Sequence, residues 1–229
     1  IWTAMQLSSR LPKGALFHMG VSNTRRCWNM FQLPESVESA CNVGCCGIDG
    51  CVSTLVGASL VNPDRLCYVV VGDLTFFYDL NSLGNHHIGT NLRVMLVNNG
   101  RGTEFRLGIH HCNVFGDDAD KYMAAAGHFG NKSPLLVKHY AEDLGFHYLS
   151  ATTKEEFMTA LSNFTNPQLS DHSMILEVFT DSKDESEALY LMSHIQSDAK
   201  GMVRSKLKDA VRNVAGEKGI NAIKKILKK

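Results

Sequence analysis

Hydrophobic residues along the chain gather in short runs that alternate with segments of helical period. The runs are rich in β-branched residues, as buried strands are, and cover 15–19, 66–71, 92–97 and 173–179. Segments with apolar residues at a helical spacing lie between them, at 51–60, 75–83, 135–144 and 154–164. This alternation predicts an α/β fold with a doubly wound, mostly parallel sheet and helices on both faces.

Segment 101–133 interrupts the pattern. Gly, Asn, His and Asp are frequent there, and no long periodic stretch occurs beyond 119–127. Irregular stretches of this length in compact domains are usually functional lids or disordered segments. We therefore expect a flap over a site, or a segment that orders against a partner.

The last thirty residues differ from the rest in charge. Residues 200–229 contain ten basic and two acidic residues, a net charge of +8, so the first 199 carry −8 because the whole chain is neutral. Apolar residues recur there at a helical spacing, which predicts a domain over 1–199 and a basic amphipathic helical tail over 200–229. Docking on the acidic body or on a neighbouring subunit is its expected role; a membrane surface or nucleic acid is the less favoured alternative.

The composition, 44% hydrophobic and 20% charged over 229 residues, is that of a globular protein and excludes disorder as the main state. The apolar runs are of strand length, and the seven cysteines are odd in number without a disulfide or zinc spacing. We expect a cytoplasmic protein with reduced thiols. A chain that starts at Ile1 rather than methionine suggests a processed chain or a piece of a longer product.

Two polar sites follow predicted strands. Gly72 and Asp73 come after one apolar run, and Asn99 and Gly100 follow the next, with 25 residues between Asp73 and Asn99. In a parallel sheet these strand ends share one edge, where helix N-termini favour phosphate oxygens. Mg²⁺ prefers oxygen ligands and retains phosphate oxygens among them. Asp73, Asn99 and a nearby backbone carbonyl therefore form a candidate bridge to a diphosphate.

The Gly-Asp pair, the spacer and the Asn-Asn pair together resemble the signature of thiamine-diphosphate enzymes, in the domain that binds the diphosphate. The resemblance implies that Asp73 and Asn99 are side-chain ligands of Mg²⁺ and that Arg101 offers its backbone oxygen. Leu74 stands where the family usually has a third glycine. The cofactor-binding residues that the resemblance implies are Ile48, Gly72, Leu74, Thr75, Asn99 and Gly100.

Residues 44–54 narrow the resemblance. With 72–81 they are similar to the menaquinone-pathway succinyl-enolpyruvyl-hydroxycyclohexene-carboxylate synthase family, which joins decarboxylated 2-oxoglutarate to isochorismate. The similarity covers 16–179 and is strongest over 44–105. It implies that Ile48 is the bulky apolar residue that bends the cofactor into a V shape. Asp49 is interpreted as a structural residue of its glycine turn.

Three residues are candidates for the substrate region. Ser22 and Arg26 match a family pair there, where a guanidinium grips a carboxylate with two hydrogen bonds. Glu104 is either a group that faces the thiazolium side and tunes a proton transfer, or an exposed loop carboxylate. Val43 stands where the family has arginine, so we expect a 2-oxoacid or an acceptor other than the menaquinone substrates.

Histidine pairs offer further candidate chemistry. His110 and His111 lie in the irregular segment near the expected cofactor mouth, and either face a substrate or are ordinary loop residues; zinc is less favoured. His86 and His87 are expected at a helix end, where imidazoles complement the helix dipole.

The resemblance implies a transferase or lyase, a 2-oxoacid decarboxylase or carboligase. It also implies that the glutamate that activates the cofactor belongs to a separate pyrimidine-binding domain or subunit. No residue of this chain is therefore assigned as catalytic. A homo- or hetero-oligomer is expected. Two alternatives remain open. The chain is a non-catalytic remnant or interaction module that keeps the fold, or a separately encoded subunit of a two-chain enzyme.

Overall fold

Six parallel strands form one sheet in the order β2-β1-β3-β4-β6-β5. The computed structural model describes residues 1–44, 46–108, 110–195 and 210. Because every strand pair is parallel, all six strands present their carboxyl ends at the same edge. The strands are β1 (Leu16–Met19), β2 (Glu38–Cys41), β3 (Cys67–Gly72), β4 (Leu92–Asn98), β5 (His147–Ala151) and β6 (Met174–Phe179).

The central strands carry side chains that are buried on both faces of the sheet. Tyr68 and Val70 of β3 belong to the core on one face, and Val69 and Val71 to the core on the other. This division follows from the alternation of side chains along a strand. A strand buried on both faces needs a continuous apolar run, which is the pattern that predicted β3, β4 and β6.

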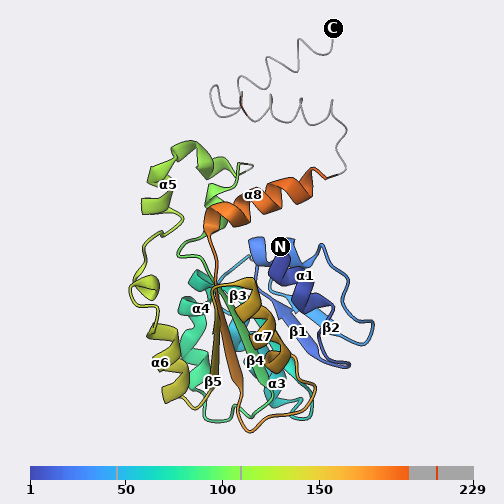
Figure 1. Ribbon diagram of the computed structural model, residues 1–229. Helices are drawn as coiled ribbons and strands as arrows, with labels where there is room; N and C mark the ends of the chain where they lie inside the picture. The colour runs from blue at the N-terminus through green and yellow to red at the C-terminus, as the bar shows by residue number, and fades with distance from the viewer. Residues whose placement is uncertain (45, 109, 196–209, 211–229) are drawn as a thin grey trace.

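Helices cover both faces (Figure 1). The first core joins the sheet to α1 (Trp2–Ser8), α2 (Asn23–Trp28) and α7 (Lys154–Phe164). The second joins it to α3 (Cys51–Leu60), α4 (Asp73–Asp79) and α6 (Leu136–Asp143). Figure 1 shows α5 (Asp117–Tyr122) and α8 (Ser182–Ser193) beyond the sheet, on the side where β6 leads into α8.

The predicted α/β fold is confirmed, with a sheet that is wholly parallel in the described part of the chain. The helices predicted over 51–60 and 154–164 coincide with α3 and α7. The helix predicted over 75–83 begins two residues earlier, at Asp73, and continues after Asp79 as the 3-10 helix η1 (Leu80–Gly84). The pattern did not predict β2, β5, α1, α2 or α8.

The helices in the described part of segment 101–133 are all short. They are the 3-10 helices η2 (Thr103–Arg106), η3 (His111–Phe115) and η4 (Phe129–Asn131), together with α5. Apart from residue 210, the predicted basic tail over 200–229 lies outside the described residues and stays a prediction. Within the described residues, no helix combines the length and the apolar character that crossing a membrane requires.

Candidate functional site

A cleft of about 1110 Å³ opens at the carboxyl ends of the strands. Its lining comes from the residues that follow all six strands and from the N-terminal residues of α1. Residues at these positions converge because the sheet is parallel. The polar and charged lining residues discussed below are Ser22, Asp73, Asn99, Arg101, Glu104, His110, Asp181 and Glu185.

Asp73 ends the strand β3 and starts α4, and its side chain is 2% exposed. One carboxylate oxygen, Oδ1, accepts a hydrogen bond from the backbone N–H of Leu74 at 3.0 Å. The other, Oδ2, lies 2.8 Å from Nε2 of His128. Burial raises the pKa of Asp73, while the hydrogen bonds from His128, Leu74 and Gly100 oppose the shift. The protein therefore holds a costly carboxylate at the strand end.

Asn99 follows the neighbouring strand, β4, and lines the same cleft. Its Oδ1 accepts a hydrogen bond from the backbone N–H of Arg101 at 3.2 Å, which closes the Asn-Gly-Arg turn. Its Nδ2 donates to Oε2 of Glu185 on α8 at 2.8 Å. The amide is thereby oriented from both sides, and α8 is tied to the end of β4.

His128 reaches Asp73 from the irregular segment. Its ring packs edge-on against Phe77 of α4, with ring centroids 5.6 Å apart. Gly130 permits this packing, since a Cβ there would lie 2.3 Å from the Phe77 ring and 2.7 Å from His128. Segment 101–133 thus lies against the site at this point, in agreement with the predicted flap.

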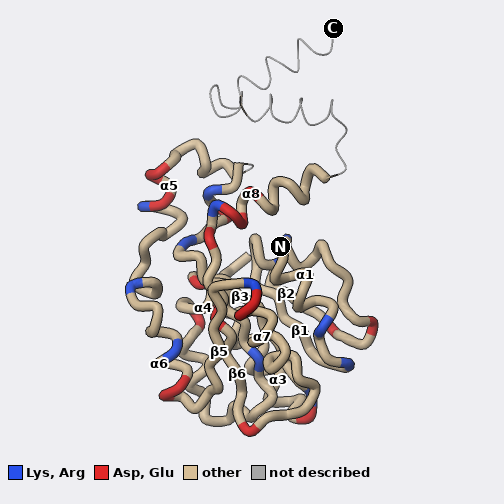
Figure 2. The backbone as a smooth tube through the Cα atoms, in the orientation of Figure 1, with Lys and Arg blue, Asp and Glu red and all other residues tan. Residues whose placement is uncertain are grey.

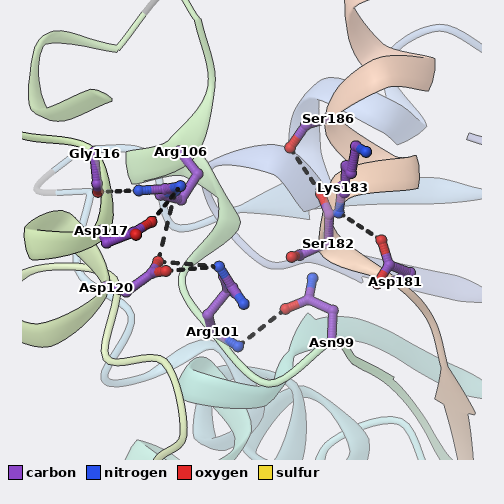
Figure 3. Close-up of polar contacts among 10 residues, drawn as sticks. All are labelled: Asn99, Arg101, Arg106, Gly116, Asp117, Asp120, Asp181, Ser182, Lys183 and Ser186. Atoms are coloured by element: carbon purple, nitrogen blue, oxygen red, sulfur yellow. Dashed lines mark hydrogen bonds and ion pairs between the residues drawn. The ribbon is translucent and has the colours of Figure 1, made fainter. Parts of the chain in front are cut away.

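Arginine–carboxylate contacts hold the same segment together (Figure 3). Nη1 of Arg101 lies 3.0 Å from both carboxylate oxygens of Asp120. Arg106 approaches Asp120 and Asp117, each at 3.6 Å, and donates to the carbonyl of Gly116. Both guanidinium groups are therefore paired within the segment. Figure 2 shows further acidic and basic residues close together where α8 begins.

Ile48 lines the cleft from the loop between β2 and α3. The preceding Gly47 packs closely on Asp49, whose Oδ1 would lie 2.5 Å from a Cβ at that position. This close approach supports the interpretation of Asp49 as a structural residue of the glycine turn. The turn places Ile48 in the lining of the cleft that also contains Asp73 and Asn99.

Ser22, Arg26 and Glu104 form a polar cluster at one end of the cleft. Nη2 of Arg26 donates to Oε1 of Glu104 at 2.7 Å, and Ser22 also hydrogen-bonds to Glu104. Burial alone would raise the pKa of Glu104, but these hydrogen bonds and the charge of Arg26 outweigh it and the pKa is lowered. Ser22 has φ +61°, a left-handed conformation that costs a non-glycine residue energy. The backbone is thus strained where it meets Glu104.

The cleft brings together most of the predicted site residues. Gly100 and Arg26 are not among the lining residues, and His110 lines the cleft whereas His111 does not. His86 and His87 lie elsewhere, just after η1, with ring centroids 3.8 Å apart. The predicted lining residues are Ser22, Ile48, Gly72, Asp73, Leu74, Thr75, Asn99, Arg101 and Glu104.

Two residues of the site were not predicted, His128 and Glu185. They lie 55 and 86 positions from their partners Asp73 and Asn99. Burial raises the pKa of Glu185, against hydrogen bonds from Thr180 and Asn99. The Gly-His-Phe-Gly sequence at 127–130 was the available signal for His128, since paired glycines allow close approach.

A buried carboxyl supports the sheet beneath the site. Oε1 of Glu177 on β6 accepts from Nδ2 of Asn98, and Oε2 accepts from the Tyr148 hydroxyl, both at 2.7 Å. Burial raises the pKa of Glu177 above its ordinary value of 4.5, although both hydrogen bonds oppose the shift. Glu177 therefore links β4, β5 and β6 at the cost of a buried charge.

The Glu177→Gln variant is expected to be at least as stable as wild type at neutral pH. Because the folded pKa is raised, the folded state holds the proton more tightly, and that stability is lost as pH rises through the folded pKa. The difference in unfolding free energy, wild type minus Gln, should therefore fall as the pH rises above the ordinary pKa of 4.5, and denaturant titrations at several pH values would measure it. A difference that grows with pH would contradict this.

The similarity to known proteins extends over most of the chain. It is 34% identical over 183 residues to 2-succinyl-5-enolpyruvyl-6-hydroxy-3-cyclohexene-1-carboxylate synthase of Bacteroides fragilis, a match of 80% of this chain and 31% of that protein. Proteins of the same name in Phocaeicola vulgatus and Christiangramia forsetii match at 34% and 35% over 187 residues, with 80% and 81% of this chain and 31% and 30% of theirs. This chain is a homologue of these synthases. No protein-family profile matches it.

The chain spans about a third of the length of its synthase homologues. The names of these homologues confirm the resemblance to the menaquinone-pathway synthase family that the Gly-Asp and Asn-Asn motifs indicated.

The donor groups at the strand ends fit a hard cation. Among the described residues, no cluster of three or more His, Cys, Asp or Glu side chains is arranged to hold a metal. The metal ligands that the resemblance implies are not a cluster of that kind. They are the carboxylate of Asp73, the amide oxygen of Asn99 and the backbone oxygen of Arg101. These are the oxygen ligands that Mg²⁺ takes when phosphates complete its coordination.

Proposed function

We propose that this chain binds thiamine diphosphate through Mg²⁺ and forms part of a 2-oxoacid decarboxylase or carboligase. The placement of Asp73 and Asn99 in one cleft, at the ends of the paired strands β3 and β4, carries the proposal. Homology to the menaquinone-pathway synthases supports it. Asp73 and Asn99 would hold the metal with the Arg101 carbonyl, and the backbone at Gly72–Thr75 and Gly100 would contact the diphosphate.

The remaining lining residues shape the cleft for chemistry. Ile48 offers an apolar surface to the middle of the cofactor, and the segment that carries His110 and Phe105 restricts water at the mouth. When bound, the cofactor supplies an electron sink for cleavage next to a 2-oxo group. Orientation of a substrate would fall to the cluster of Ser22, Arg26 and Glu104. A pyrimidine-binding domain or subunit is proposed to complete the site in a homo- or hetero-oligomer.

Calorimetric titration of thiamine diphosphate, with and without Mg²⁺, tests this function directly. We expect saturable binding that requires the metal, since the diphosphate is held mainly through it. Mn²⁺ can replace Mg²⁺ as a paramagnetic probe of the same oxygen ligands. Absence of binding to the folded chain in both metals would favour the non-catalytic alternative.

Removal of the His128 side chain is expected to strengthen metal binding. His128 engages Oδ2 of Asp73, the oxygen that the Leu74 N–H does not hold, so a metal that coordinates this oxygen must displace His128. Breaking a hydrogen bond costs about 0.5–1.5 kcal/mol, so His128→Ala should lower the apparent Kd for Mg²⁺ about three- to tenfold in the presence of thiamine diphosphate. His147→Ala, which alters an exposed histidine on β5, is the matched control. Unchanged or weaker metal binding in His128→Ala would refute the competition.

A further inference from the structure

The guanidinium of Arg26 is already occupied by a carboxylate of the chain itself. Glu104 lines the cleft, whereas Arg26 does not, so the acidic group is the one presented to a ligand. Nη2 of Arg26 donates to Glu104 at 2.7 Å, and Nη1 donates to Oδ1 of Asn23 at 3.0 Å. Ser22 supplies a further hydrogen bond to the same carboxylate. An arginine and a hydroxyl that converge on one carboxylate are the donors that a ligand carboxylate would require.

The lysine and arginine side chains that line the cleft are engaged elsewhere and cannot replace Arg26. Among the described residues that line it, the lysine and arginine side chains are Arg101 and Lys154. Arg101 is paired with Asp120, and Lys154 lies 5.5 Å from the centre of the Trp2 ring. The acidic lining residues are Asp73, Glu104, Asp181, Asp184 and Glu185. A ligand carboxylate that approached Glu104 would therefore meet like charge.

We propose that Glu104 determines specificity by filling the carboxylate subsite formed by Ser22 and Arg26, so the substrate carries an uncharged group at this end of the cleft. This inference rests on the proposed function for the identity of the ligand as a 2-oxoacid or its acceptor. It concerns only the far end of the substrate and not the carboxylate next to the 2-oxo group. The second carboxylate of a dicarboxylic substrate would therefore find this subsite filled by a residue of the chain.

Succinate is a suitable probe, because it presents two carboxylates and requires neither metal nor cofactor. Calorimetry on the full chain, without thiamine diphosphate or Mg²⁺, would compare wild type, Glu104→Gln and Glu104→Ala. Both variants should bind succinate at least tenfold more tightly than wild type, since the guanidinium becomes available and the repulsion disappears. A second substitution, Arg26→Met, should abolish the gain. Thermal unfolding identifies any variant that fails to fold. Glu104→Gln keeps the size of the side chain and Glu104→Ala does not, so a gain in both variants is due to the lost carboxylate rather than to a change in side-chain volume.

Glu38→Gln provides the matched charge change. Glu38 pairs with Arg65 at 2.8 Å on the amino-end side of the sheet, so its replacement removes the same charge from a similar contact away from the cleft. We expect wild-type succinate binding in this variant. The proposal would be overturned if neither Glu104 variant bound succinate more tightly than wild type does. Measurable and equal binding in all three proteins would mean that Glu104 moves aside for a ligand. The titration of thiamine diphosphate with Mg²⁺ is a separate experiment, so the proposed cofactor binding and the proposed role of Glu104 can fail independently of each other.

Discussion

Replacement of Asp73 with alanine is expected to abolish metal-dependent binding of thiamine diphosphate. Asp73 is the one charged side chain in the proposed ligand set, and Asn99 and the Arg101 carbonyl offer only neutral oxygens. Loss of a buried charged partner typically costs about 3–5 kcal/mol, so affinity should fall by a factor of roughly 100 or more. Calorimetric titration of thiamine diphosphate in the presence of Mg²⁺ measures this loss.

The asparagine variant separates binding from stability. Asp73→Asn keeps the shape of the side chain and an acceptor for the Leu74 N–H, but removes a charge whose burial is unfavourable. Its unfolding free energy without metal should equal or exceed that of wild type, while metal-dependent binding is lost. Asp64→Ala, which removes an exposed carboxylate from the loop before β3, should bind as wild type does. Near-normal affinity in either Asp73 variant would remove the carboxylate from the metal site.

The sequence predicted strands that lie inside the sheet, where burial on both faces requires a continuous run of apolar residues. β3, β4 and β6 lie inside the sheet, and both of their faces are buried, so their residues are almost uniformly apolar. β2 and β5 are the two edge strands and carry mostly exposed or half-buried residues. With one side open, such strands need no apolar run, and nothing in 38–41 or 147–151 marked them. Helices α3 and α7 were predictable because each buries one regular stripe.

The residues of the site also divide into those that the sequence predicted and those that it did not. Asp73 and Asn99 were predictable, because their positions follow from the parallel sheet and from the strands that precede them. His128 and Glu185 were not, since their contacts depend on how segment 101–133 and α8 fold back over the strand ends. Arg26 and Glu104 were both predicted as substrate residues, but neither position in the sequence indicated that the two side chains pair with each other. Sequence identifies the groups here, while only the fold shows which are already paired.

The chain by itself is expected to turn over no 2-oxoacid, even when loaded with cofactor. Four of the acidic residues that line the cleft are engaged: Asp73 with His128, Glu104 with Arg26, Glu185 with Asn99, and Asp181 with the backbone at the start of α8. The fifth, Asp184, lies exposed in the first turn of α8. The family resemblance implies that a glutamate of a pyrimidine-binding domain activates the cofactor, and this chain spans about a third of its homologues.

Two measurements on one sample separate an inactive site from an empty one. Calorimetry establishes that the cofactor is bound, and release of CO₂ from pyruvate or 2-oxoglutarate then reports turnover, with a full-length homologue as the positive control. Exchange of the C2 hydrogen of the cofactor with deuterated solvent, followed by NMR, should stay at the rate of the free cofactor, because four of the five acidic residues that line the described cleft are held in contacts of their own. CO₂ release above a cofactor-free control would show that the described cleft contains its own activating acid. Asp184→Asn would then be the first variant to examine, since Asp184 is the lining carboxylate not committed to another contact.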